Sequence, residues 1–384
     1  MTLHLFNPEH DIALATNVAR FTAPHAGRQL RADLGFLPAL WAAVGDMVLV
    51  DDVEAALEAV RHVRRLAADV VFVSPNDVKS LPPSVSVAPW GWDQGVVEQL
   101  RLMGFPELVP PAEQLEAIRR LSSRQWAAEH LLPVLRQTSP ELTGEARYID
   151  SFDALQHMMQ AVGGVMEKEL AAFHSPFSHG EDWGGAVLKA PWSSSGRGVR
   201  YVLNHDHWQH NAAWARNIIQ RQGGIMLEPY YNKVKDFGME FEARPDGRVE
   251  YCGLSVFQTA NGAYTGSVIA TERAKCEMLG RYVEMQLLDA VRDNICSKMA
   301  EALQGIYTGP FGVDMMIVAG KELSTNFLLH PCVELNLRRT MGHVALSIPC
   351  DDTMPQRLMR IDYTNRYHLR IIDTNENVLN GLML

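Results

Sequence analysis

A lysine precedes a loop of small residues in the stretch AVLKAPWSSSGRGVRYV, which spans residues 186–202. Apolar residues lead up to Lys189, the loop covers 193–198, and a second β-prone run follows it. The pattern predicts a strand, a flexible loop and another strand. Glycine and serine let a backbone close over phosphate oxygens with its N–H groups pointing inward, and the lysine adds a point charge for the same anion. The stretch therefore predicts a cover for a nucleotide triphosphate, although a polar hairpin with a surface lysine would show the same residues.

Two other kinds of phosphate-binding loop are excluded by the residues around Lys189. A Walker A loop ends with a glycine, a lysine and a serine or threonine that enter a helix, and here no lysine follows Gly198. A dinucleotide-binding fingerprint of the G-x-G-x-x-G type also leads into a helix, whereas the residues from Val199 onward favour a strand. The function of the stretch depends on its partners elsewhere in the chain.

Oxygen ligands recur on two strand-like segments nearer the C-terminus. The segment GPFGVDMMI is apolar except for Asp314, and the segment VELNLR alternates apolar and polar residues. Because side chains alternate across a strand, Glu334, Asn336 and Arg338 project from one face. Mg²⁺ prefers carboxylate and amide oxygens together with nucleotide phosphates, so the segments predict a partial magnesium shell. A half-exposed strand is the alternative for Glu334 and Arg338, but an unpaired carboxylate among the apolar neighbours of Asp314 would be costly.

The first part of the chain alternates strand and helix patterns. Strands are expected over 2–6, 46–50 and 69–73, and apolar residues at three- and four-residue steps predict a helix over 53–66. This alternation indicates a parallel sheet whose ligands lie beyond the carboxyl ends of its strands. Glu9, His10 and Asp11 directly follow the first strand and are candidates for substrate contacts, with residues 74–77 weaker candidates. Turn-forming residues would also be found there in any sheet of this kind.

Further elements are expected from hydrophobic spacing between these groups. They are a helix over 208–221, strands over 239–243 and 249–257, a loop over 258–266, one long helix over 275–303, and an amphipathic segment 152–170 inside the polar stretch 138–185. His205, His207 and His210 invite a zinc interpretation, but no fourth ligand is spaced to complete the site, so a solvated loop is expected there.

Composition limits the class of protein. The 384 residues carry a formal net charge of -10 and are 47% hydrophobic, which fits a globular chain of two or three subdomains. A basic stripe for nucleic acid is missing from the sequence, as is any apolar stretch near the roughly 18 residues of a membrane span. The start, MTLHLFNPEHDIALA, lacks a signal-peptide pattern, and five scattered cysteines without a C-x-x-C pair fit a reducing cytoplasm. Neither a nucleic-acid nor a membrane partner is expected.

Four motifs in sequence order make the chain resemble the ATP-grasp superfamily, which includes D-alanine:D-alanine ligases, biotin carboxylases and glutathione synthetases. The motifs are VLKAPWSSSGRGV, MLEPYY, GPFGVDMMI and VELNLRRTMGH, and the resemblance covers residues 121–348. It implies an α/β (α+β) chain with an ATP-grasp fold behind an N-terminal Rossmann-like domain. The expected units are residues 1–112 for that domain, 113–224 for a lid carrying Lys189, and 225–384 for a C-terminal subdomain carrying the metal site.

The resemblance implies roles for residues at the nucleotide. Lys189 matches the lysine that reaches the ATP phosphates, and Arg124 falls where many members carry an earlier phosphate-binding lysine. The mobile loop over the phosphates corresponds to Ser194, Ser195, Gly196 and Gly198, and the adenine and ribose would be held by Glu228, the carbonyl of Pro229, the N–H of Tyr231 and the carboxylate of Asp236.

Metal and substrate roles follow from the same resemblance. Asp314, Glu334 and Asn336 match the set that binds Mg²⁺ or Mn²⁺. Arg338 resembles the residue that steadies a transferred phosphoryl group, and Arg339 and Arg273 are weaker candidates for gripping a substrate carboxylate.

The implied activity is ATP-dependent ligation of a carboxylate to an amine through an acyl phosphate. Positioning and charge neutralisation suffice for such chemistry, and the sequence offers no G-x-S-x-G elbow or other covalent nucleophile. Two alternatives stay open, a phosphotransferase acting on a small molecule and a nucleotide-binding module without turnover. The expected partners are small carboxylates and amines and, as for many cytoplasmic enzymes, a second copy in a homodimer.

Overall fold

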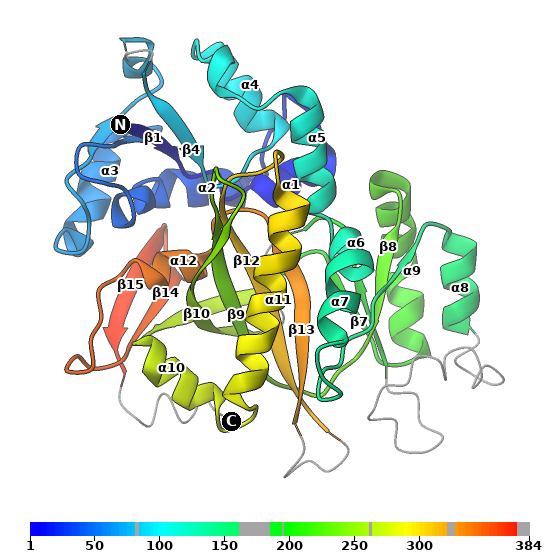
Figure 1. Ribbon diagram of the computed structural model, residues 1–384. Helices are drawn as coiled ribbons and strands as arrows, with labels where there is room; N and C mark the ends of the chain where they lie inside the picture. The colour runs from blue at the N-terminus through cyan, green and yellow to red at the C-terminus, as the bar shows by residue number, and fades with distance from the viewer. Residues whose placement is uncertain (81–83, 161–184, 194–195, 261–262, 321–326, 375–384) are drawn as a thin grey trace.

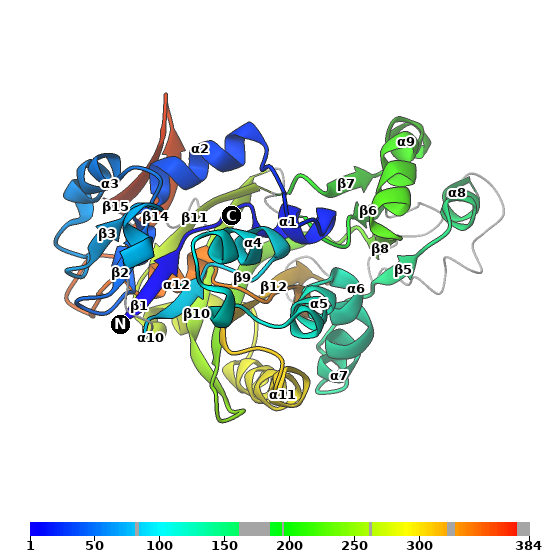
Figure 2. The same ribbon diagram turned by 90° about the horizontal axis from the view of Figure 1, so that it is seen from above.

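The computed structural model describes residues 1–80, 84–160, 185–193, 196–260, 263–320 and 327–374, which form three sheets with helices packed against them (Figure 1). The sheet of the first residues, in blue, lies above the long central strands in Figure 1, and a small sheet containing β7 and β8, in green, lies to one side. Seen from above, the small sheet and its helices α8 and α9 project away from the rest of the molecule (Figure 2). The candidate residues therefore come from three sheets that must meet to form a site.

The N-terminal sheet is parallel, as the sequence predicts, with the order β3-β2-β1-β4. Its strands are β1 (Thr2–Leu5), β2 (Met47–Leu49), β3 (Val71–Val73) and β4 (Ser86–Pro89), and its helices are α1 (His10–Thr16), α2 (His25–Leu34), α3 (Val53–Val60) and α4 (Gln94–Leu102). Asp52 and Asp93 cap α3 and α4 by accepting hydrogen bonds from backbone N–H groups three residues on. Helix α3 is shorter than predicted because a tighter 3-10 turn takes over at Arg61–Val63.

The small sheet has the order β5-β8-β6-β7. It is formed by β5 (Arg147–Ile149), β6 (Ala186–Lys189), β7 (Val199–Val202) and β8 (Ile225–Pro229), and β6 and β7 pair antiparallel on either side of the glycine-rich loop, as predicted. Because β8 pairs with β5 and β6, this sheet extends to Pro229, beyond the end expected for the lid. Helices α8 (Phe152–Gln160) and α9 (His205–Gln222) cover its apolar side.

The three histidines expected in a loop lie instead in the first turns of α9. Asn204 accepts a hydrogen bond from the backbone N–H of His207 and so starts the helix ahead of Trp208, where the apolar spacing begins. His205, His207 and His210 are exposed. Half of the stretch 138–185 singled out in the sequence falls on residues 161–184, which lie outside the described residues.

The central sheet has seven strands in the order β13-β12-β9-β10-β11-β14-β15. They are β9 (Lys233–Ala243), β10 (Val249–Ala260), β11 (Ala263–Ile269), β12 (Gly309–Ala319), β13 (Phe327–Asn336), β14 (Arg357–Tyr363) and β15 (Tyr367–Asp373). The loop predicted over 258–266 is wrong, because β10 continues to Ala260 and β11 pairs with it from Ala263. The β-branched and aromatic residues of this segment find a neighbouring strand, which outweighs its glycines.

The long helix predicted over 275–303 is also wrong, because the chain forms two helices there. Helix α10 (Glu272–Leu279) ends at Gly280, and α11 (Met285–Leu303) begins after Glu284. The apolar residues of α11 pack on one face of the central sheet, against Phe237, Val313 and Met315. Since strand side chains alternate, Gly238, Asp314 and their neighbours are left on the opposite face. That face is free to hold polar ligands.

Short helices complete the surroundings of this polar face. They are α5 (Ala112–Leu121), α6 (Arg124–Trp126), α7 (Leu132–Arg136) and α12 (Met341–Leu346), with a π-helical turn over Ala127–Leu131. Among the residues that the structure describes, none of the helices has both the length and the apolar character to cross a membrane.

Candidate active site

Lys189 lies at the end of β6, where the strand meets the glycine-rich loop, and it is buried beside Glu228 of β8. The Lys189 Nζ lies 2.5 Å from the Glu228 Oε2, across neighbouring strands of the small sheet. Both charges are held out of solvent and each offsets the burial cost of the other. The pair places a cation and an anion side by side. The resemblance implies that the Lys189 cation contacts the phosphates and that Glu228 lies beside the adenine.

The glycine-rich loop returns close to its own start. Gly196 has a positive φ of 69°, which favours glycine, and the Ala190 N–H donates to the Gly198 carbonyl over 2.8 Å. A Cβ on Gly198 would overlap the side chain of Ser193, so a residue without a side chain is required there. Ser194 and Ser195, also predicted to contact phosphate, lie outside the described residues.

Arg124 joins the glycine-rich loop to the central sheet. Its Nη1 donates to the Ala190 carbonyl over 2.7 Å and to the Ser193 Oγ over 2.8 Å, while its Nη2 lies 2.6 Å from the Glu334 Oε1 on β13. The guanidinium suits this task because its planar fork donates in several directions at once. The structure thus brings together Arg124, the loop after Lys189 and one member of the predicted metal set, although 210 positions separate Arg124 from Glu334 in the chain.

The predicted metal ligands lie side by side on the polar face of the central sheet. Asp314 and Glu334 are directly paired in the register of β12 and β13, and the Asn336 Nδ2 donates to the Asp314 Oδ2 over 3.0 Å. Burial, followed by the nearby Glu334 and Glu240 carboxylates, raises the pKa of Asp314 to about 8. Crowded carboxyl and amide oxygens of this kind fit a hard divalent cation. Within the described ranges, however, no group of three or more His, Cys, Asp and Glu side chains forms a ready metal site, so phosphate oxygens would have to complete the shell.

Glu240 is a buried carboxylate on the same face that the sequence analysis missed. It lies on β9 between Gly312 of β12 and Gly253 of β10, and a Cβ on Gly312 would come within 2.5 Å of its Oε2. That Oε2 has no hydrogen-bond partner among the described residues. The His343 Nδ1 lies 3.0 Å from it, but this nitrogen accepts a hydrogen bond from the Thr340 N–H. In the sequence, Asp236, Gly238 and Glu240 occupy alternate positions of β9, and this spacing could have placed Glu240 on the same face as Asp236.

The residues expected around adenine and ribose border the same space. Pro229 ends β8, and Tyr231 is buried with its ring edge-on to His330, at a centroid distance of 5.6 Å. The Asp236 Oδ2 accepts hydrogen bonds from the Lys233 Nζ and the Thr259 Oγ1, each over 2.6 Å. A ribose hydroxyl would therefore have to compete with these two donors for the carboxylate.

His330 is a second residue that the sequence analysis missed. It is fully buried next to Tyr231, and neither ring nitrogen has a hydrogen-bond partner among the described residues. Burial, with the positive charges of Lys189 and Arg136, lowers the pKa of His330 to about 3. The ring is therefore neutral, and Gly144 leaves room for it, since any Cβ there would lie 2.8 Å from ring atoms.

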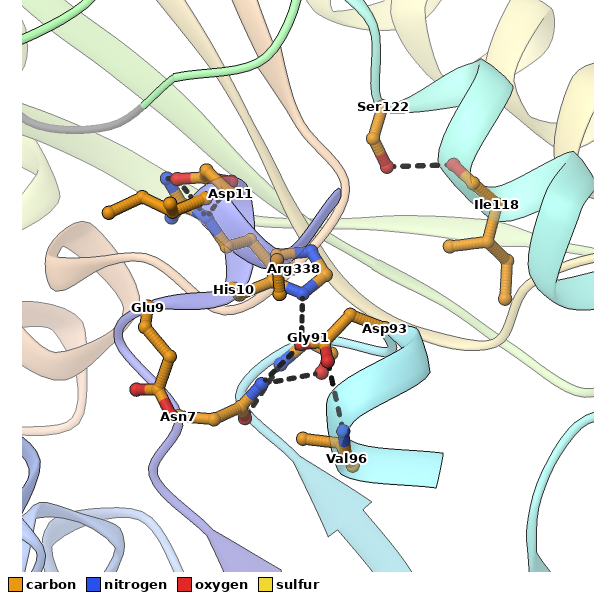
Figure 3. Close-up of polar contacts among 12 residues, drawn as sticks. Asn7, Glu9, His10, Asp11, Gly91, Asp93, Val96, Ile118, Ser122 and Arg338 are labelled. Carbon is orange, nitrogen blue, oxygen red and sulfur yellow. Dashed lines mark hydrogen bonds and ion pairs between the residues drawn. The ribbon is translucent and has the colours of Figure 1, made fainter. Parts of the chain in front are cut away.

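Arg338 connects the central sheet to the N-terminal sheet. Its Nε lies 3.0 Å from the Asp11 Oδ1, and its Nη2 lies 2.8 Å from the Asp11 Oδ2 and 2.9 Å from the Asn336 Oδ1 (Figure 3). Burial by itself would raise the pKa of Asp11, but the charge and hydrogen bonds of Arg338, together with other nearby positive charge, lower it overall. Arg338 thus contacts both the substrate candidate Asp11 and the metal candidate Asn336.

The other two substrate candidates lie in the same turn after β1. The His10 Nδ1 lies 3.1 Å from the Asp93 Oδ2, and the Glu9 Oε1 pairs with the Arg31 Nη1 over 3.0 Å. Asp93 was not identified in the sequence as a partner of His10, because nothing in the residues around Asp93 links it to a histidine 83 positions earlier.

The two weaker arginine candidates have different surroundings. The Arg339 guanidinium lies over the Trp41 ring, 4.7 Å from its centroid, and its backbone N–H donates to the Trp90 carbonyl. Arg273 lies on the exposed side of α10, where it pairs with Glu277 and Asp352. These Arg273 contacts involve no other predicted site residue, so the structure does not bring Arg273 into the cluster.

Comparison by sequence finds no matching protein-family model and no matching curated protein. Solved structures match in fold. A crystal structure of N5-carboxyaminoimidazole synthetase from Staphylococcus aureus with ADP matches with a TM-score of 0.52 and 11% identity, over 99% of this chain and 95% of the other. An ADP complex of N5-carboxyaminoimidazole ribonucleotide synthetase matches with a TM-score of 0.50 and 11% identity, over 99% and 94% of the two chains.

A third match is a protein from Archaeoglobus fulgidus described as a putative member of the ATP-grasp superfamily. It has a TM-score of 0.44 and 11% identity over 98% of this chain and 100% of the other. The fold that the four sequence motifs imply is confirmed by the arrangement of the sheets and by the two preceding matches, and this chain has the ATP-grasp fold.

Proposed function

We propose that the protein is an ATP-dependent ligase that joins a carboxylate to an amine. Mg-ATP would bind between the small sheet and the central sheet. The double contact of Arg124, to Ser193 on the phosphate loop and to Glu334 on the metal face, carries the proposal. Because one side chain contacts both elements, the phosphates and the cation would both bind close to Arg124. Two structures that are similar in fold were both solved with ADP, which also supports a nucleotide in this fold.

The roles of the residues follow from their charges. Lys189 and Arg124 would exchange their present carboxylate partners for phosphate oxygens, and Arg338 would steady the phosphoryl group in transfer. Asp314, Glu334 and Asn336 would hold Mg²⁺ or Mn²⁺, which neutralises charge on the phosphates when bound. Substrate would approach from the turn that holds Glu9, His10 and Asp11, with Arg339 as a further carboxylate contact.

The proposal includes an arrangement of domains and a location. The N-terminal sheet would form one unit over residues 1–112. The small sheet would belong to a lid over residues 113–224, and the central sheet would belong to the unit 225–384, whose first strand, β8, pairs with the lid. A cytoplasmic location is supported by the five cysteines, all of which are unpaired. The proposed partners are small carboxylates and amines, and the proposed oligomer is a homodimer.

The proposed function is tested by measuring ADP release from Mg-ATP by the purified protein. Pools of amino acids, small carboxylates and amines are added in turn. We expect one pool to stimulate release in the wild-type protein and in Lys298→Ala, a change of a half-buried lysine on α11, but not in Lys189→Ala. Phosphate retained in the product would instead indicate a phosphotransferase. ATP binding without stimulation by any pool would favour a binding module, and absence of Mg-ATP binding would contradict the proposal.

A further inference from the structure

His10 is the first residue of α1, and its side chain is 1% exposed. The Nδ1 is 3.1 Å from the Asp93 Oδ2, while the Nε2 is buried and has no hydrogen-bond partner among the described residues. Gly91 lies against the ring, since a Cβ there would come within 2.7 Å of three ring atoms. The ring is therefore fixed on one side by Gly91 and Asp93, with one polar atom left unsatisfied (Figure 3).

The contacts of Asp93 determine which nitrogen carries the proton. The Asp93 Oδ1 accepts from the Val96 N–H over 2.9 Å, and the Oδ2 accepts from the Asn7 Nδ2 over 3.0 Å, as expected for an ionised carboxylate that only accepts. The His10 Nδ1 must then be the donor to Asp93. In the neutral ring the proton is on Nδ1, and the unpartnered Nε2 is a bare lone pair. The arrangement thus presents a basic nitrogen in a fixed orientation.

The residue that carries this basic nitrogen is next in the chain to a residue of the candidate active site. Asp11, the next residue in the chain, contacts Arg338, which contacts Asn336, which contacts Asp314. Asp11 and His10 leave the start of α1 toward different partners, Arg338 and Asp93 (Figure 3). The Asp11 carboxylate also feels the charge of Arg124. His10 therefore directly precedes Asp11, from which a series of side-chain contacts leads to the proposed metal ligands.

We propose that the His10 Nε2 accepts the proton released by the amine in the ligation step, with Asp93 as the positioning residue that holds the tautomer. The inference rests on the proposed function. The amine nitrogen forms a bond to the carbonyl carbon of the acyl phosphate, the phosphate leaves with the electron pair of the broken C–O bond, and the nitrogen gives its proton to Nε2. Because Nε2 is buried, the amine would reach it only after a local movement of the turn that holds His10 and Asp11.

The test separates the proton-transfer step from formation of the acyl phosphate. Wild-type protein and His10→Gln are incubated with Mg-ATP and a pool of the amino acids with acetate and succinate. The nucleophile is either ammonium or hydroxylamine, which is unprotonated at neutral pH and attacks acyl phosphates without a base. The matched control is His4→Gln, because His4 is another buried histidine of the same sheet, 3.1 Å from Asp46.

We expect His10→Gln to form hydroxamate at about the wild-type rate but to form amide roughly 100-fold more slowly, while His4→Gln changes neither rate. Equal amide formation by His10→Gln and wild type would overturn the proposal. Loss of both products in His10→Gln alone would also overturn it, because His10 would then serve folding or substrate binding.

A second measurement does not depend on turnover. Nitrogen NMR of the histidine rings reports which nitrogen carries the proton in the full-length protein. A bare Nε2 on His10 that becomes protonated in Asp93→Asn supports the proposal, since the amide would donate to Nδ1 and reverse the tautomer. A protonated Nε2 in the wild type overturns it. If wild-type protein forms neither hydroxamate nor amide, the proposed ligase function has failed, and this measurement alone decides whether a basic nitrogen is built into the turn.

Discussion

Arg124 is the residue on which the link between the two halves of the candidate nucleotide site depends. It is buried, and it donates to the glycine-rich loop and to Glu334 at the same time. A lysine would keep the charge but could not donate along two directions from one planar group. An arginine therefore suits this position better than the lysine that the resemblance implies for many members of the superfamily.

Replacing Arg124 with alanine is expected to destabilise the protein by about 3 kcal/mol, because Glu334 loses its partner in a partly buried pair. Mg-ATP affinity should fall at least about tenfold. Urea unfolding and nucleotide titration measure the two effects. The control is Arg273→Ala, which removes only exposed ion pairs and should leave the free energy of unfolding close to the wild-type value. Equal effects of the two changes would contradict the role given to Arg124.

His330 predicts a pH dependence of stability. Its pKa is lowered to about 3 by burial and nearby positive charge, so the folded protein binds this proton less readily than the unfolded chain does. The His330 contribution to the free energy of unfolding is therefore complete above about pH 6.5 and is lost as pH falls toward 3, by up to about 1.4 kcal/mol per pH unit. Chemical unfolding of His330→Phe across this range should show a correspondingly flatter profile. An unchanged profile in His330→Phe, or an equal change in exposed His210→Gln, would refute the assignment.

At the scale of elements, the turn between β6 and β7 depends on the close approach of Gly198 to Ser193. A Cβ on residue 198 overlaps Ser193 and lies 3.2 Å from the Ala190 side chain, so Gly198→Ala must move the loop. We expect roughly tenfold weaker Mg-ATP binding with little change in the helices and strands, measured by titration and circular dichroism. Gly27→Ala on α2 is the control, because its added Cβ meets only ordinary contacts of 3.6 Å or more.

The elements also show where sequence patterns stop being informative. The strand–loop–strand at Lys189 was predictable from alternation and small residues, and so was the row of Glu334 and Asn336 on one strand face. The end of α10 at Gly280 was missed because the apolar spacing continues across it. Strand β11 was missed because its extended conformation is stabilised by pairing with β10. Local composition cannot report a neighbour that is distant in the chain.

At the scale of the whole molecule, the N-terminal sheet is tied to the central sheet through Asp11 and Arg338. The two residues are 327 positions apart, so their contact follows from the register of both sheets and not from any local motif. The same is true of His10 with Asp93. The sequence predicted the residue types of the site, but the partner of each charged group became visible only in the assembled fold.

The tie between the sheets is expected to be cooperative. Asp11→Ala and Arg338→Ala should each cost about 3 to 5 kcal/mol, because each leaves a buried charge without its partner. The double variant should cost much less than the sum, which gives a coupling energy above about 1 kcal/mol in a double-mutant cycle. Urea unfolding followed by tryptophan fluorescence measures it. Additive costs would show that the two groups do not stabilise the interface through each other.

The buried pairs at the candidate site also decide in which form ATP can enter. Lys189, Arg124 and Arg338 are each matched by a carboxylate, and Asp314 and Glu240 add two further carboxyl groups. A nucleotide carrying four negative charges would therefore enter a space in which these three cations are already paired. Binding would therefore be ordered, with the metal arriving on the nucleotide or before it. An excess of metal-free ATP would compete only weakly with Mg-ATP and would cause little inhibition.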